Sequence, residues 1–442
     1  APGQNAKWKP HSYEQDGVFE TQGSARHLGF IPGVLVTTEI PKFAFTYWQP
    51  EMTIEEVNTK ARESDFINLP DKIYSKYPNW IKPLNRDIKA VFNPEQNPHF
   101  NHGECIRWII RDGSEVVGRI AAFIDHKTAT KNDQPTGGVG FFEAVDDLKV
   151  STLLFEAARQ WLKARKMEAM DGPVNFGERD KWWGLLIDGY EYEPNYCVNY
   201  NPPYYKRLFE QYGFQEYYKQ FTYYRPIAGD ISESIKARAE RLTRKGDYAF
   251  THVAKTSLKK VAKDFLEVYN NAWSSYPDVV PMDRQQVDAL LKQIKPIMDR
   301  KLIWFGYYRD QPIAFAIMLP EVNQIFKHMN GKFGWFQQLK FAWLLRQGIC
   351  TKILGVAFGI VPRFQRKGVE SAMIEAIGKL AFNEEKTFRY KDIEHNWVGD
   401  FNPQMMHVHE MMGGSIRKTH ATYRYLFDQT KPFKRAPEIG MK

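Results

Sequence analysis

Apolar positions between residues 52 and 430 follow two periods, and their alternation predicts a mixed α/β fold. Short apolar runs of strand length, such as 353–361, are separated by segments whose apolar residues recur every three to four positions, as on one face of a helix. Strands that alternate with helices, with some hairpins between them, indicate a mixed sheet covered by helices. We therefore expect an α/β (α+β) architecture.

The second half of the chain shows this pattern most clearly. We expect helices near 257–272, 283–298, 368–382 and 402–412. We expect strands near 302–308, 313–319, 353–361, 388–396 and 416–427. An additional apolar helix is expected near 333–348, and each half of the chain is expected to end in a hairpin.

Two landmarks recur at nearly one spacing, which indicates an internal duplication. The pairs Arg111-Asp112 and Arg309-Asp310 each lie between two strand-like runs, and Gly113 completes a tight hairpin in the first. The offset between these pairs is 310 − 112 = 198.

The second landmark is a helix end followed by a strand. Glu-Gln-Tyr-Gly at 210–213 and Glu-Met-Met-Gly at 410–413 each precede a Thr-Tyr pair, with an offset of 410 − 210 = 200. We infer two copies of one fold, roughly 52–225 and 226–430, each with a mixed central sheet flanked by helices. Residues 431–442 form a tail.

The first 51 residues are rich in glycine, proline and aromatic residues, with little periodicity. They form either a docked arm or an extension upstream of the natural start. A helical pattern is expected to begin at Met52.

Composition narrows the class of protein. Of the 442 residues, 43% are hydrophobic and 15% aromatic, as in a folded globular protein, and no run of 18 uncharged apolar residues predicts a membrane-spanning helix. The polar N-terminus lacks the apolar core of a secretory signal. Cys105, Cys197 and Cys350 lie too far apart to suggest a disulfide framework or a zinc knuckle. We therefore expect a cytoplasmic protein.

A net charge of +9 favours an anionic partner. Nucleic acid, an acidic membrane surface or a polyphosphate cofactor would each fit, and so would a set of solvated charged faces. The chain has no basic low-complexity tail and no zinc-finger or RNP-type motif, so nucleic acid is not expected.

One segment has the pattern of a phosphate site. The apolar run 353–362 leads through a basic turn, Arg363-Phe-Gln-Arg-Lys-Gly368, into an amphipathic helix that begins at Val369. Free backbone N–H groups and the helix dipole both point at such a turn and favour an anion. By itself this pattern does not identify the phosphate compound.

The same segment resembles the acyl-CoA motif of the GNAT superfamily of acyltransferases. In that motif a Gln or Arg is followed by two residues, Gly, one residue, and then Gly or Ala. The matching positions are Gln365, Gly368 and Glu370, and Val361-Pro362 precede them as in the family. The final small residue is replaced by Glu370, which we expect to turn outward. The resemblance implies acyl-CoA as cosubstrate, no metal, and contacts from Ile360, Val361, Arg363, Gln365, Arg366, Lys367, Gly368, Val369 and Asn402.

The resemblance extends to the catalytic acid. GNAT enzymes often carry Asn, then Tyr seven residues on, then Gly four further, and the Tyr reprotonates the departing CoA thiolate. Here these positions are Asn402, His409 and Gly413. Histidine can deliver a proton near pH 7, so His409 is the expected acid, and a plain surface role on the helix is the alternative.

Glu394 is the candidate base. An amine must lose a proton to attack a thioester, and a carboxylate whose pKa is raised by burial can accept that proton. Backbone N–H groups near Ile360 would polarise the thioester carbonyl. The alternative is that Glu394 is a structural partner of a nearby Arg or Lys.

The first copy lacks the cradle. Its strand at 138–145 leads into Asp146-Asp147, with two acids and no glycine. We therefore expect CoA to bind only the second copy, and Asp146 and Asp147 to begin an ordinary helix.

Further segments resemble a subgroup of bacterial two-domain GNAT proteins. They are 171–176, 184–190, 269–273, 280–282 and 319–324. Some members look related to the bacterial ceramide-synthase type, which acylates a long-chain sphingoid amine. This resemblance implies acyl transfer from acyl-CoA, acetyl or longer, to a primary amine.

The inserted segment 333–348 combines aromatic residues with Lys332, Lys340 and Arg346. Such a composition suits a membrane interface or the wall of a lipid tunnel. Apolar stripes are usually buried, which favours core packing.

Two other functions fit the sequence. A CoA or lipid sensor without turnover would explain Glu370 and the missing Tyr. An aminoacyl-tRNA-dependent ligase also has a double GNAT fold, but the CoA turn argues against it. The amine, the acyl length and the oligomeric state are not specified by the sequence.

Overall fold

The computed structural model describes residues 52–131, 134–227, 231–244, 246–273, 281–383 and 388–438. Pro50–Lys442 form one compact unit. The arm expected at 1–51 lies outside the described residues.

Helices and strands alternate along both halves of the described chain. The strands are β1 (Thr53–Glu56), β2 (Gly103–Asp112), β3 (Glu115–Asp125), β4 (Thr136–Ala144), β5 (Ala169–Gly172), β6 (Leu185–Asp188), β7 (Gln215–Pro226), β8 (Tyr248–His252), β9 (Ile303–Tyr308), β10 (Gln311–Pro320), β11 (Lys352–Ile360), β12 (Asp392–Gly399) and β13 (Ser415–Leu426). The helices are α1 (Lys60–Ile73), α2 (Asn85–Val91), α3 (Leu148–Ala164), α4 (Tyr204–Tyr212), α5 (Glu233–Thr243), α6 (Leu258–Trp273), α7 (Arg284–Ile294), α8 (Asn323–Phe326), α9 (Trp335–Arg346), α10 (Val369–Asn383) and α11 (Pro403–Met411). The α/β architecture is confirmed.

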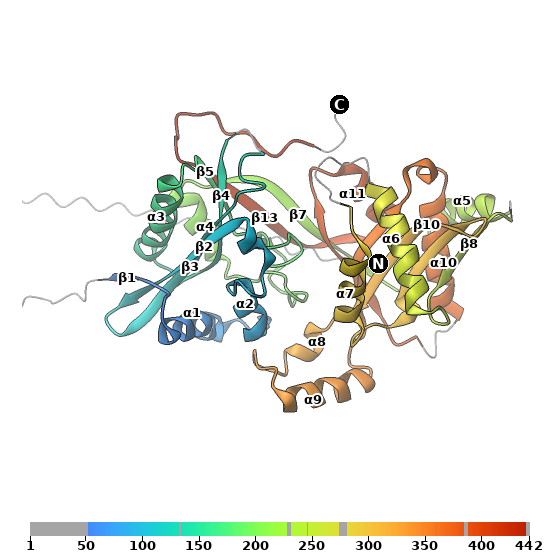
Figure 1. The fold of residues 1–442 in the computed structure, drawn as a ribbon, viewed down its shortest axis with the longest axis horizontal. Helices are drawn as coiled ribbons and strands as arrows, with labels where there is room; N and C mark the ends of the chain where they lie inside the picture. The colour runs from blue at the N-terminus through green and yellow to red at the C-terminus, as the bar shows by residue number, and fades with distance from the viewer. Residues whose placement is uncertain are drawn as a thin grey trace, which may run out of the picture. The chain divides into compact units, whose positions relative to one another are not determined.

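The two expected sheets are joined into one because the copies exchange their last strands. The strand order is β1-β2-β3-β4-β5-β13-β7-β12-β11-β10-β9-β8, and β6 also pairs with β13. The last strand of the first copy, β7, therefore lies beside β12 of the second, and β13 lies beside β5 of the first. Strands β7 and β13 run side by side where the two copies meet (Figure 1). The hairpin expected at the end of each copy forms between the copies, as the antiparallel pair β7–β13.

The helix-end landmark has the same structure in both copies, whereas the hairpin turn of the first copy lies two residues later than its Arg-Asp pair predicts. Gly213 and Gly413 both adopt positive φ at the ends of matching helices, at 111° and 75°. Arg309 and Asp310 form the turn between β9 and β10, whereas Arg111 and Asp112 end β2 and the turn falls on the next two residues. The boundary between the copies near residue 225 stays a prediction.

Side-chain alternation along the strands builds two cores in the second copy. Trp304, Ala314 and Ala316 face α5 and α10. Their neighbours Phe305 and Phe315 face α6 on the other side of the sheet. Because successive strand residues point to opposite faces, the sheet is covered by helices on both.

The first copy is built in the same way. Ile110 and Ile120 pack with α3, and Ile109 and Ala121 pack with α1 on the other face. This region also corrects one expectation, because residues 53–56 form an edge strand paired with β2 instead of a helix. The helix begins only after Thr59, whose hydroxyl caps it by accepting from the Arg62 N–H.

The three cysteines are free, as expected. Of the described helices, none is long and apolar enough to cross a membrane.

Candidate active site

The turn that is expected to form the phosphate cradle follows the end of β11. A short 3₁₀ turn, Pro362–Phe364, leads to Gly368 and then to the N-terminus of α10. Gly368 has φ of +91°, a conformation that side chains disfavour. The Gln365 side chain donates to the Ile360 carbonyl at 3.0 Å, which fixes the turn.

The cradle presents positive charge to solvent. Arg363, Arg366 and Lys367 are exposed, while Gly368 and Val369 are buried beneath them. Arg363 donates to the Gln311 side chain at 3.1 Å. Exposed cations beside a helix N-terminus favour the binding of a phosphate group.

Strands β11 and β12 diverge beside this cradle. Their parallel pairing runs from Lys352 to Gly355 and ends there, although β11 continues to Ile360. The Val361 N–H donates to the Ile313 carbonyl of the neighbouring strand. Since successive N–H groups point to opposite sides, the Ile360 N–H is directed toward the opening, as an oxyanion donor requires.

The corresponding opening in the first copy is filled by backbone. Pairing of β4 with β5 ends at Gly138, and the Val174 N–H then donates to the Val139 carbonyl at 2.8 Å. A Cβ on Gly140 would lie 1.9 Å from the Val174 carbonyl oxygen, so the two segments are in direct contact.

The turn of the first copy is also occupied by its own side chains. The Asp147 carboxylate accepts from the Lys149 N–H and caps α3, while Asp146 forms an ion pair with Arg207. These roles are those of an ordinary helix N-terminus.

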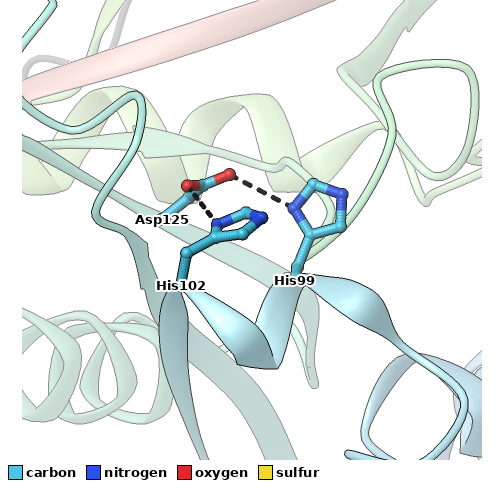
Figure 2. Close-up of side chains that lie close together, drawn as sticks. All are labelled: His99, His102 and Asp125. Carbon is cyan, nitrogen blue, oxygen red and sulfur yellow. Dashed lines mark hydrogen bonds and ion pairs between the residues drawn. The ribbon is translucent and has the colours of Figure 1, made fainter. Parts of the chain in front are cut away.

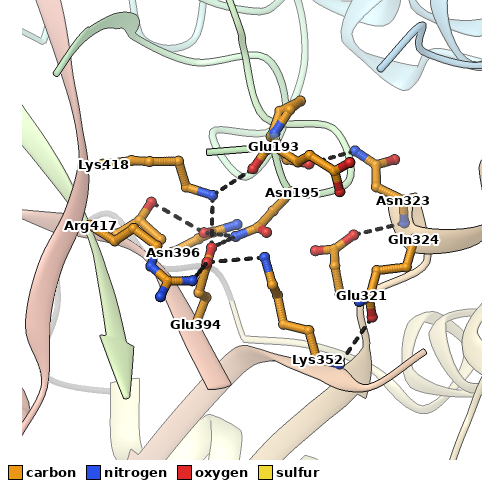
Figure 3. Close-up of polar contacts among 12 residues, drawn as sticks. Glu193, Asn195, Glu321, Asn323, Gln324, Lys352, Glu394, Asn396, Arg417 and Lys418 are labelled. Atoms are coloured by element: carbon orange, nitrogen blue, oxygen red, sulfur yellow. Dashed lines mark hydrogen bonds and ion pairs between the residues drawn. The ribbon is translucent and has the colours of Figure 1, made fainter. Parts of the chain in front are cut away.

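Glu394 lies at the centre of a buried polar cluster (Figure 3). One carboxylate oxygen accepts from Lys418 at 2.7 Å and Asn195 at 2.8 Å. The other accepts from Lys352 and Arg417, both at 3.1 Å. Four segments, including a loop of the first copy, therefore meet at one carboxylate.

These cations make Glu394 a poor base. Burial raises its pKa, but the charges of Lys418 and Lys352 outweigh burial and bring the pKa down to about 2. The expected raised pKa is wrong, because the sequence did not reveal that three cations surround this position. The environment is that of the alternative, a structural ion pair.

His409 occupies a different face of β12 from Glu394. Its ring stacks on Tyr223 at 4.8 Å and lies 4.7 Å from the ring of His395. Burial lowers the pKa of His409 to about 4, and burial together with His409 lowers the pKa of His395 to about 3. Both imidazoles are neutral near pH 7, so the expected proton delivery by a charged His409 is not supported there.

Asn402 has a local role. Its side-chain oxygen accepts from the Met405 N–H at 3.2 Å and caps α11, the helix that carries His409. Asn402 and His409 therefore share one helix, and the cradle residues share one turn. Glu394 and His409 are separated. His409 packs against His395, and the side chains of the neighbouring residues Glu394 and His395 point to opposite faces of β12.

Glu321 is a carboxylate that the sequence did not single out as a candidate. One of its oxygens accepts from the N–H groups of Tyr196 and Asn323, at 3.0 and 2.8 Å, and the other has no partner among the described residues. Burial raises its pKa to about 7. Glu321 therefore exchanges a proton near neutral pH, the property that was expected of Glu394. Its place just after a strand gave no sign of this.

A histidine–carboxylate group lies in the first copy (Figure 2). His102 and His99 contact separate oxygens of Asp125, at 2.9 and 3.2 Å, and the three could in principle hold a metal ion. The Nδ1 atom of each imidazole already contacts the Asp125 carboxylate, so the three side chains are held together without a metal ion. That the protein uses no metal stays a prediction.

Comparisons with known proteins agree with the resemblance drawn from the motif. The chain is 29% identical to the bacterial ceramide synthase of Caulobacter vibrioides over 382 residues, 84% of this chain and 97% of that protein. It is 26% identical to protein YghO of Escherichia coli, with 81% and 91% covered. No protein-family model matches the chain.

A solved structure supports the fold. It contains the GCN5-related glucosamine N-acetyltransferase region of a fungal multi-domain β-N-acetylglucosaminidase, and it matches with a TM-score of 0.50 at 10% identity. The match covers 85% of this chain and 38% of that chain, so it spans less than half of the fungal protein. The GNAT fold, which this chain contains in two copies, and the resemblance to the ceramide-synthase type are confirmed.

Proposed function

We propose that this protein transfers an acyl group from acyl-CoA to a primary amine, with CoA held only by the second copy. The observation that carries the proposal is the contrast between the copies. In the second, an exposed cationic turn at a helix N-terminus adjoins diverging strands, while in the first the opening is filled by Val174. CoA needs both a phosphate site and an opening for its pantetheine arm.

The residues of the second copy would bind CoA through backbone and charge. The turn from Gln365 to Gly368 would hold the pyrophosphate, with Arg366 and Lys367 adding charge. The Ile360 N–H would stabilise the oxyanion formed when the amine attacks the thioester carbonyl. Holding amine and thioester together would supply much of the rate.

We further propose that the acceptor is a lipid amine with a long chain, of the sphingoid type. Support comes from the similarity to the bacterial ceramide synthase, which extends over nearly the whole of that protein. A second line of support is a surface suited to lipid.

That surface lies on α9, which is apolar on two sides. Phe341 and Leu344 are buried against α8, as core packing requires. On the other side, large apolar side chains are 58–64% exposed: Trp335, Phe336, Leu339 and Trp343. Core packing, which the sequence favoured for this segment, therefore holds for one side of the helix, and the other side is exposed. The composition of the segment did not distinguish a helix in the core from a helix at a membrane interface, because aromatic residues occur in both.

The charge around α9 suits an anionic membrane surface. Residues 322–369 contain eight lysines and arginines and no aspartate or glutamate. Lys332, Lys340 and Arg346 are exposed beside the aromatic side chains. Aromatic residues flanked by cations favour the headgroup region of a bilayer, so we propose peripheral membrane contact through α9.

The test is release of CoA thiol from acyl-CoAs of increasing length, in the presence of sphinganine or short primary amines. Mass spectrometry would identify the amide. The proposal requires thiol release that depends on the amine, together with a stoichiometric amide. CoA binding without thiol release would instead identify a sensor, and amide formation only from aminoacyl-tRNA would identify a ligase.

A further inference from the structure

A cavity of about 800 Å³ lies on the face of the sheet that α10 covers. Its floor is formed by side chains of adjacent strands, including Met318, Ile353 and Ile393. Its roof is formed by the C-terminal half of α10, where Ile374 and Ile377 project from one side of the helix. A volume of this size is within the range of roughly 300–1,000 Å³ of small-molecule sites.

The cavity and the phosphate cradle lie at opposite ends of the same helix. The cradle adjoins the N-terminus of α10 at Gly368, whereas the cavity residues of α10 begin at Ile374 and continue toward its C-terminus. His395 and His409 line the cavity at the strand that diverges from β11. A molecule bound by its phosphates at the cradle and threaded along the diverging strands would reach the cavity at these histidines.

We propose, on the basis of the acyl transfer argued above, that this cavity holds the long alkyl chain of the acyl-CoA. The apolar walls match a chain of methylenes, which has no polar group to satisfy. The neutral imidazoles of His395 and His409 lie where the polar thioester would meet the apolar chain.

Charge favours the acyl chain over the chain of the amine substrate. The charged side chains that line the cavity are mainly cationic and include Lys301, Arg389 and Lys391. Among the described residues that line the cavity, Glu375 is the one carboxylate, and it pairs with Lys379 at 2.9 Å. A protonated amine is repelled by such a lining, whereas an uncharged acyl chain is not.

The test compares acyl-CoAs of two lengths in the wild type and in Ile377→Trp, which places a large ring in the cavity. Leu290→Trp, on the exposed side of α7, is the matched control. Each buried methylene strengthens binding by roughly fourfold, about 0.8 kcal/mol. Burial of even four methylenes therefore makes dodecanoyl-CoA bind roughly 250-fold more tightly than butyryl-CoA.

We expect Ile377→Trp to reduce this ratio at least tenfold, and Leu290→Trp to leave it unchanged. Calorimetry with unacylated CoA, which has no chain, would show that the variant still folds. Ile374→Trp, one turn earlier, repeats the test at a second position of the same wall.

The outcomes separate the cavity from the proposed function. An unchanged ratio in both variants that bind CoA would overturn the cavity assignment while leaving acyl transfer intact. If Ile377→Trp instead abolished only a preference for long-chain amines, the chain of the amine would occupy the cavity. That result would also overturn the assignment of the cavity to the acyl chain. Preference for long acyl-CoAs that depends on Ile377, without amide formation, would support the cavity and refute the acyl transfer.

Discussion

Replacing Glu394 with glutamine tests whether this carboxylate is a structural anchor or a base. The substitution removes the negative charge but keeps the shape, so Lys352, Arg417 and Lys418 lose the carboxylate with which all three form ion pairs. Removing one partner of a buried ion pair lowers the free energy of unfolding by about 3–5 kcal/mol.

The pKa of Glu394 gives a second measure of the cost. Its fall from 4.5 to about 2 corresponds to about 3 kcal/mol of stability at neutral pH. Because the folded pKa is lowered, this stabilisation is complete above about pH 5 and is lost as the pH falls through 4.5 toward 2. In Glu394→Gln this loss between pH 4.5 and 2 should be absent.

The assay is urea unfolding followed by tryptophan fluorescence at pH 7, with Glu240→Gln as control. Glu240 forms an exposed ion pair with Arg244, and its loss should cost less than about 0.5 kcal/mol. The fall of the turnover rate at acid pH should occur at the same pH in Glu394→Gln as in the wild type, because a group with a pKa of about 2 does not cause that fall. Unchanged stability combined with a rate loss above about 100-fold would refute this reasoning and make Glu394 the base.

Three further predictions concern the surrounding residues. Glu321→Gln should be more stable than the wild type at pH 8, by up to about 3 kcal/mol, because a raised carboxyl pKa of about 7 makes wild-type stability fall as pH rises from 4.5 through 7; equal unfolding free energies at pH 8 would contradict it. His409→Ala should slow turnover at pH 7 and saturating acyl-CoA by less than about tenfold, since the N–H of a neutral imidazole is too weak an acid to protonate a thiolate; a loss above about 100-fold would restore the acid role. The double variant Trp335→Ser, Trp343→Ser should no longer sediment with vesicles of anionic lipid and should keep its CoA affinity; undiminished sedimentation would place membrane contact elsewhere.

Local patterns in the sequence predicted most of the elements. The strand expected at 353–361 is β11 at 352–360, and the helix expected at 333–348 is α9 at 335–346. Period and apolar content determine such elements locally. The strand exchange is different, because β7 and β13 follow similar helices, and either could complete either sheet. Which one does so depends on pairing across about 200 residues.

The candidate site was predictable only where it is contiguous. The turn from Gln365 to Gly368 forms one loop, so its residue types and order sufficed. The surroundings of Glu394 were not predictable, because Asn195 comes from the other copy and Lys418 from the exchanged strand. The exposure of Trp335 was equally hidden, since aromatic residues occur both in cores and at interfaces.

Calorimetric titration of CoA is the most direct test, because we propose a single CoA site in the second copy. Wild type should bind one CoA per chain. Gly368→Val should lose binding, since valine disfavours a φ of +91° and blocks the approach of phosphate to the backbone. Asp147→Ala, in the corresponding turn of the first copy, should bind CoA as the wild type does. Two CoA molecules per chain, or full affinity in Gly368→Val, would contradict the account.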